Sequence, residues 1–461
     1  MTRLSSKITA AVVAGFLAAP ASAQTLSEAF ATAYSTNPTL IAARAGVRAV
    51  DEGVPIARSG MLPDVAATAS VGVTRTTVNG TPPGSSTEPR SVGVEASQVL
   101  FDGGRTFNSI DSAVSDVDAA RARLSDTEQT VLLQVVTAYM NVIRDQEFVS
   151  LGRNNVRLIA EQLRAARDRF EVGEVTRTDV SQAEARLAQA EASLAVQEGA
   201  LARSFQAYGN VVGAPPGDLA PPPPLPSLPP TLADAVSEAL DNNPSLRAER
   251  FDEEAARSDI ALAQGALLPT VTLSGSVAYS EDQSANLSNG VTSAQVQLNA
   301  TIPLYQGGAA YAGIRQAQAL QSQQMTEIRV AARNVREATE NAWTDLATAR
   351  IAIRAGRQQV AAAQIAFEGV REEAKLGART TLDVLDAEQE LLGARSDLVS
   401  AERDEYVAAF AVLNALGRLS VAGLGVDVAP YDPNQNYEAN NDRLFGFERD
   451  ELTEWKSPVH P

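Results

Sequence analysis

Few side chains in this sequence could do chemistry, and those that could are carboxylates. The chain has no cysteine and a single histidine, His460, which excludes thiol catalysis and argues against histidine-based metal sites or triads. Asp383 and Asp386 stand three positions apart, a spacing that puts both carboxylates on one face of a helix. Because charged residues make up 20% of the chain, such pairs are usually solvated surface, and we predict no enzyme, no metal site and no cofactor.

Some of these aspartates have a second possible role as helix caps. Thr176 and Thr380 are each followed three residues later by an aspartate, Asp179 and Asp383, which is the spacing of a capping box at a helix N-terminus. For Asp179 we therefore predict a cap. Asp386 lies beyond the first helical turn, where capping does not explain it.

The two threonine–aspartate pairs stand at matching places in two copies of one long unit. Thr25 and Thr231 are 206 residues apart, Gly173 and Gly377 are 204 apart, and matches continue along most of the chain. Solenoid repeats are only about 20 to 50 residues long, so each copy is a complete unit used twice. We predict a signal peptide at 1–23, a first structural repeat at 24–214, a Pro-rich, stiff connector at 215–230, a second repeat at 231–429 and a polar, irregular C-terminal tail at 430–461.

Each copy is predicted to contain two β-strands. Apolar residues alternate with small or polar ones, and the predicted strands cover about 64–74, 91–101, 270–280 and 293–302. About ten residues is the length of a tilted strand that crosses a membrane with one lipid face and one polar face, although an ordinary soluble sheet has the same alternation. Stretches rich in Gly, Pro, Ser and Asn at 77–89 and 282–290 are predicted as exposed hairpin loops.

The N-terminus and the number of strands together indicate an exported membrane oligomer. Arg3 and Lys7 precede an apolar run at 8–19 and a small-residue cleavage site, the pattern of a signal peptide, and this run is too short for a membrane helix. Four strands cannot close a barrel, and open strand edges are not tolerated in lipid. Several copies of the chain must therefore contribute to one barrel if the strands cross a membrane.

Long helices are predicted after each pair of strands, at about 104–212 and 308–417. Residues 90–214 and 304–429 contain no proline and are dominated by strong helix formers. A helix from Gly104 to Gly173 would be roughly 103 Å long at 1.5 Å per residue. Shorter helices are predicted to begin at Asn37-Pro38 and Asn243-Pro244, with a kink at Pro55 in the first copy only. The fold class is mainly α with membrane β-strands.

The most specific segments are the two predicted helix–turn–helix tips, at 170–180 and 376–386. With the duplication and the Asn-Pro helix starts, they make the sequence resemble the TolC family of outer-membrane channel proteins over essentially all of the mature chain. The resemblance implies a homotrimer in the outer membrane, with one twelve-stranded β-barrel continued by an α-helical tunnel through the periplasm. It also implies a passive exit duct for efflux or type I secretion, working with a periplasmic membrane-fusion adaptor and an inner-membrane pump or ABC exporter.

The resemblance assigns roles to individual tip residues. In the family, the aspartates that match Asp383 and Asp386 ring the periplasmic pore entrance and attract cations, and Arg379 with Thr178 matches a polar link that holds the gate shut. A second link, to the position of Asp179, lacks its usual tyrosine because this chain has Ala374 there. The implied docking surface for the adaptor consists of Gly173, Glu174, Val175, Thr176, Gly377, Ala378, Thr380 and Thr381.

Other functions compete with this interpretation. A trimeric porin or adhesin with a helical surface stalk would leave the two matched tips and the periplasm-length helices unexplained, and a soluble periplasmic coiled-coil scaffold would be soluble without detergent. An envelope hydrolase would require a site made of carboxylates alone. A net charge of -18 argues against binding to nucleic acid.

Overall fold

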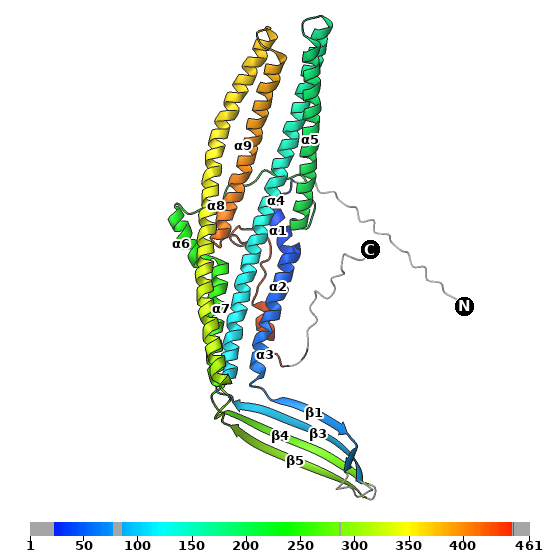
Figure 1. Ribbon diagram of the computed structural model, residues 1–461, viewed down its shortest axis with the longest axis vertical. Helices are drawn as coiled ribbons and strands as arrows, with labels where there is room; N and C mark the ends of the chain where they lie inside the picture. Colours follow the sequence, from blue (N-terminus) through cyan, green and yellow to red (C-terminus); the bar gives the residue numbers. More distant parts are fainter. Residues whose placement is uncertain (1–22, 77–84, 285–286, 445, 447–461) are drawn as a thin grey trace, which may run out of the picture.

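The computed structural model is an elongated molecule with two helical hairpins at one end and a β-sheet at the other (Figure 1). It describes all residues except 1–22, 77–84, 285–286, 445 and 447–461. The predicted signal peptide, apart from Ala23, and His460 lie outside the described residues. Among the described residues, no helix combines the length and the apolar character needed to cross a membrane.

The same succession of elements occurs twice. The N-terminal half contains α1 (Leu26–Thr36), α2 (Pro38–Asp51), α3 (Gly53–Ser59), β1 (Asp64–Val71), β2 (Thr74–Thr76), β3 (Ser85–Phe101), α4 (Arg105–Glu171) and α5 (Arg177–Val212). The C-terminal half contains α6 (Leu232–Asn242), α7 (Pro244–Gly265), β4 (Thr270–Ser284), β5 (Leu287–Thr301), α8 (Ala309–Lys375) and α9 (Thr381–Ala415), followed by α10 (Gln435–Asn440). We call α4 with α5 the first hairpin and α8 with α9 the second hairpin.

The sheet is antiparallel, with the order β1-β3-β4-β5. Because β1 and β2 both pair with β3, they are two parts of one interrupted strand. Strands β3, β4 and β5 reach farther than predicted: β3 begins at Ser85, and β4 pairs with β5 out to Ser284 and Leu287. The predicted loops at 77–89 and 282–290 were therefore too long. Loop-like composition disfavours a strand only weakly where neighbouring strands supply hydrogen-bond partners.

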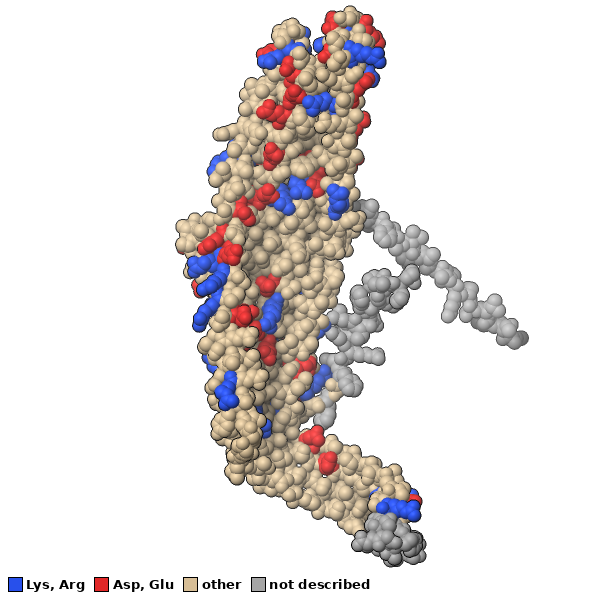
Figure 2. Space-filling view, in the orientation of Figure 1, with Lys and Arg blue, Asp and Glu red and all other residues tan. Residues whose placement is uncertain are grey.

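One face of the sheet is apolar and the other polar. Cross-strand neighbours lie on the same face, and one row across the four strands consists of Ala67, Val94, Val277 and Ala294. A row on the opposite face consists of Ala66, Glu95, Ser276 and Gln295. Val94 and Val277 are more than half exposed, so nothing in the described part of the chain covers the apolar face at this row. On the side drawn in Figure 2, charged side chains are sparse on the sheet and gather at both helical tips.

The short helices begin and end where the sequence predicts. The Asn37 side chain accepts a hydrogen bond from the Thr39 backbone at 2.9 Å, and Asn243 does the same for Ser245 at 3.0 Å. Helix α2 ends at Asp51, four residues before Pro55, because a proline ring clashes with the carbonyl four residues earlier. Helix α7, which has Ala261 at the matching position, is continuous.

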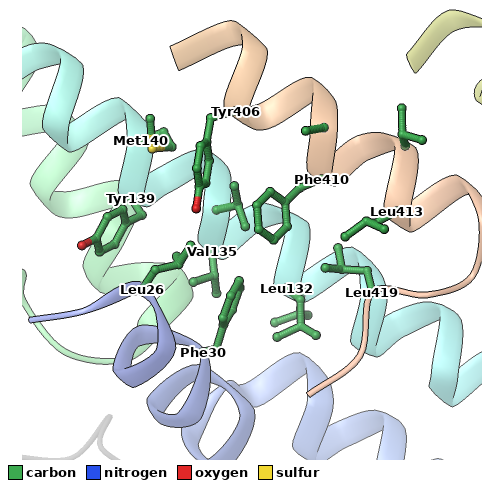
Figure 3. Packing of buried hydrophobic residues seen from close by; sticks show 14 of the residues in the cluster. Leu26, Phe30, Leu132, Val135, Tyr139, Met140, Tyr406, Phe410, Leu413 and Leu419 are labelled. Atoms are coloured by element: carbon green, nitrogen blue, oxygen red, sulfur yellow. The ribbon is translucent and has the colours of Figure 1, made fainter. Parts of the chain in front are cut away.

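The main core lies midway along the molecule, where α1 and α6 pack against the long helices (Figure 1). The buried side chains that Figure 3 labels are Leu26, Phe30, Leu132, Val135, Tyr139, Met140, Tyr406, Phe410, Leu413 and Leu419. The Pro-rich connector packs against this core through Leu219, Leu225 and Leu228. The Tyr139 hydroxyl donates a hydrogen bond of 2.6 Å to the Ala220 carbonyl, so the connector is fastened to the core.

The C-terminal tail is more ordered than the sequence predicts. It forms α10 and folds back along α2, where the Asn436 amide donates a hydrogen bond of 3.0 Å to the buried Asp51 carboxylate. The Arg121 guanidinium of α4 lies 5.2 Å from the centre of the Tyr437 ring. The prediction of an irregular tail was wrong for residues 435–440, because these contacts come from helices more than 300 residues away in the sequence.

Candidate functional site

The two helical hairpins end in tips of the same construction, residues 172–176 and 376–380. Gly173 and Gly377 have φ angles of 79° and 77°, a left-handed conformation that glycine adopts without steric cost. The Glu174 amide donates to the Arg169 carbonyl at 2.9 Å, and the Ala378 amide donates to Glu373 at 3.0 Å. These bonds close the last turn of each ascending helix as a Schellman motif and reverse the chain direction.

Both tips start the descending helix with the predicted capping box. The Asp179 carboxylate accepts bonds of 2.8 Å from the backbone amide and the hydroxyl of Thr176. Asp383 accepts equivalent bonds of 2.9 and 2.8 Å from Thr380. Hydrogen bonds from these threonines hold the pKa of both aspartates below their ordinary value. Since only Oδ2 of Asp383 takes part, the cap leaves its other carboxylate oxygen available for other contacts.

Asp386 is not part of the cap. Its Oδ1 accepts a hydrogen bond of 2.8 Å from the Arg186 guanidinium, so an ion pair joins α9 to α5. Asp386 was predicted from the sequence as a site residue and Arg186 was not, because 200 residues separate them and no local pattern relates them. Among the described residues, no cluster of three or more His, Asp or Glu side chains could hold a metal ion.

Arg379 pairs within its own tip. Its Nε donates a hydrogen bond of 2.9 Å to the Glu373 carboxylate, an ion pair that turns the guanidinium toward the end of α8. In the described part of a single chain, Arg379 makes its ion pair with Glu373 and not a link to Thr178. Glu373 was missed because its pairing depends on the tight reversal at Gly377.

The tip residues predicted to dock an adaptor are on the surface. All are exposed except Val175 and Thr381, which are half-buried. Two apolar residues that the sequence analysis did not single out are more exposed than expected for their type: Val172 at 71% and Leu376 at 87%. Each lies directly before the tip glycine, so comparison of the two copies could have identified them.

The family was identified by comparison with known proteins. Residues 30–214 and 235–418 each match the model described as outer membrane efflux protein. The chain belongs to this family. It is 38% identical over 424 residues to the outer membrane efflux protein BepC of Brucella suis, and the match covers 92% of each chain. It is 28% identical over 425 residues to the outer membrane protein TolC of Vibrio cholerae, covering 88% of this chain and 93% of that protein.

Solved structures agree on the fold of this efflux protein. The outer-membrane channel OprN superimposes with a TM-score of 0.73 at 22% identity, covering 85% of this chain and 89% of that chain. The outer membrane protein VceC of Vibrio cholerae gives a TM-score of 0.73 at 20% identity, covering 85% and 96%. The resemblance to the TolC family is thus confirmed. The chain is thus an outer membrane efflux protein, and a relative that is 27% identical over 326 residues, AprF of Pseudomonas aeruginosa, is named an alkaline protease secretion protein.

Proposed function

We propose that three copies of this chain close one barrel of twelve strands, continued by a helical tunnel that serves as a passive exit duct. The observation that carries the proposal is the sheet. It is four strands wide, it has an exposed apolar face and a polar face, and β1 and β5 are edges without a partner in the described part of the chain. Such edges cannot lie unpaired in hydrocarbon, and pairing β5 of one copy with β1 of the next satisfies both.

The helices support a tunnel that spans the periplasm. Helices α4 and α8 each contain 67 residues, so each is about 100 Å long at 1.5 Å per residue. Their tips lie at the end of the molecule opposite the sheet (Figure 1), which is the end that faces the inner membrane if the sheet is in the outer membrane. There a membrane-fusion adaptor docks on the exposed tip residues, with Val172 and Leu376 as apolar anchors, and an inner-membrane pump or ABC exporter supplies the energy.

The gate is proposed to lie at these tips, around Asp383, Asp386, Arg379, Thr178 and Asp179. The available oxygen of Asp383 faces the pore and attracts cations, while the cap holds its carboxylate in place and ionised at neutral pH. Because Arg379 makes its ion pair within its own tip, a link from Arg379 to Thr178 would have to form between neighbouring copies.

Single-channel conductance of the detergent-purified protein in a planar bilayer tests the channel and its gate. We expect a small wild-type conductance that a trivalent cation blocks, and loss of that block in Asp383→Ala/Asp386→Ala. A folded oligomer that forms no pore would refute the channel. A pore that the cation blocks equally in both proteins would keep the channel and exclude these aspartates as the cation site.

A further inference from the structure

The two hairpins of one chain meet along a seam near their tips. The seam contains a small apolar cluster in which Ile159 of α4 and Ala190 of α5 pack against Leu385 of α9. The ion pair between Arg186 and Asp386 crosses the same seam. It lies about one helical turn nearer the tip than Gln389 of α9. Among the ion pairs of the described residues, it is the only one that joins the first hairpin to the second.

Next to this ion pair the seam is hollow and polar. A cavity of about 190 Å³ opens between α4, α5 and α9, and Arg186 and Leu385 contribute to its wall. Its polar lining residues are Asn155, Gln189, Ser193, Gln197, Gln389 and Ser396. The buried Oε1 of Gln197 has no hydrogen-bond partner among the residues that the structure describes. A polar cavity of this size is large enough for several waters, so the seam is wet where a fixed helix interface would be packed.

A wet seam with one small apolar cluster separates more easily than a dry one, because few apolar contacts are lost when the helices part. The polar contacts across it therefore contribute a large share of what holds α9 against the first hairpin. An ion pair with partly exposed partners changes an equilibrium by only about twofold to fivefold in one chain. In a trimer that opens as a unit, three such pairs act together and their effects multiply.

We propose that Arg186 is a positioning residue for the gate: its ion pair with Asp386 latches α9 to α5 in the closed tip and is released when the second hairpin moves outward. This inference rests on the proposed function of the tips as a gate. It gives Asp386 a role beyond the cation site, because this aspartate also joins the two hairpins through Arg186. It also names a partner for Asp386 that lies in the other half of the sequence.

Charge reversal tests the latch. Arg186→Glu and Asp386→Arg each place like charges opposite one another, and we expect each to raise the closed-state conductance by about fivefold or more and to make cells susceptible to vancomycin. The double variant R186E/D386R restores an ion pair of opposite polarity and should return both measurements toward the wild type. Arg167→Glu is the matched control, because Arg167 pairs with Glu184 inside the first hairpin and does not cross the seam.

The outcomes separate the latch from the channel. If the wild type conducts and the single variants behave like it, the latch is refuted and the channel stands. The same holds if the double variant is as leaky as the single variants. A wild-type trimer that does not conduct would refute both. Heat-dependent migration of the trimer on a denaturing gel checks that each variant is assembled.

Crosslinking gives a second test that does not depend on charge. Because the chain has no cysteine, Arg186→Cys/Asp386→Cys introduces the only two thiols. A bifunctional methanethiosulfonate reagent that joins them should abolish export and keep the conductance at its closed level. A reductant that cleaves the crosslink should restore export and let the conductance rise again. Export that continues at full rate through the crosslinked trimer would show that α5 and α9 need not part there, and would overturn the proposal.

Discussion

The two hairpins contain the same ion-pairing residues but use them differently. In the first hairpin, Arg167 and Glu184 form a surface ion pair of 2.6 Å between α4 and α5. The matching residues of the second hairpin, 204 positions later, are Arg371 and Glu388. There Glu388 is only 5% exposed and its Oε1 has no hydrogen-bond partner among the described residues, while the Arg371 guanidinium lies 5.6 Å from the centre of the Phe367 ring.

This difference teaches that duplication preserves residue types more readily than it preserves their surroundings. Glu388 lies one helical turn from Val384 and Leu391 of one apolar cluster and from Leu385 of another. Burial there raises the pKa of Glu388 to about 7, so it holds a proton where Glu184 is paired at the surface. We therefore expect the stability of the helices around Glu388 to depend on pH, and that around the matching Glu184 not to.

Phe367→Ala should have the largest effect. The ring is buried in the cluster that holds α8 against α9, and removing such a ring leaves a cavity that costs about 3–5 kcal/mol. Hydrogen exchange measured by mass spectrometry should show loss of protection in the second hairpin only. Leu163→Ala is the matched change in the first hairpin, and we expect it to reduce protection in the first hairpin instead of the second. Loss of protection in both hairpins from either change would mean that they do not open separately.

Glu388→Gln should stabilise the second hairpin at alkaline pH. The folded protein keeps a proton that the unfolded chain releases above pH 4.5, so the stability contributed by neutral Glu388 is full below pH 4.5 and is lost as the pH rises to about 7. The amide keeps the shape without the charge, and we expect roughly 1–3 kcal/mol of added protection at pH 8 and almost none at pH 4.5. Glu184→Gln should show no such gain, and a gain independent of pH for Glu388→Gln would exclude ionisation as the cause.

The two caps should respond alike. Thr176→Ala and Thr380→Ala each remove the hydroxyl and leave the backbone bond to the aspartate, at a cost of about 1 kcal/mol in local helix stability. Exchange rates of the first-turn amides of α5 and α9 measure this cost. Unequal losses would show that the two tips differ in more than the buried carboxyl of Glu388, and that one cap contributes more to the stability of its helix than the other.

Arg167→Ala should have the smallest effect. Both partners of the pair are about half exposed, and surface ion pairs contribute about 0–1 kcal/mol. Protection of the first hairpin should change little at low salt and not at all at high salt. A loss larger than about 1 kcal/mol would mean that the surface pair supports the hairpin more than its exposure suggests.

The features predicted correctly from the sequence are those fixed by neighbours along the chain. The capping boxes at Thr176 and Thr380, the Asn-Pro helix starts and the break before Pro55 all depend on contacts within a few residues. Strand alternation also survives, because the pleat imposes a period of two wherever the strand pairs. The ends of the strands were wrong because they depend on hydrogen bonds to neighbouring strands, whether these belong to the same copy or, as for β3 with β4, to the other copy.

The features that the sequence did not reveal depend on packing between distant segments. Arg186 meets Asp386, Glu388 is buried and α10 folds along α2 only because the two copies are laid side by side. The same residue types at Glu184 and Glu388 give opposite environments, so residue type alone could not distinguish them. The resemblance identified the family, but it assigned Asp386 to the pore without its partner.

The open edges of the sheet have a consequence for how the protein reaches the membrane. A lone chain exposes the backbone groups of β1 and β5, a template on which any other strand can add. Such a chain is an aggregation hazard in the periplasm and cannot enter lipid by itself. For the proposed trimer, insertion and assembly therefore have to be one event, and the rate at which channels appear should rise more steeply than linearly with the concentration of exported chains.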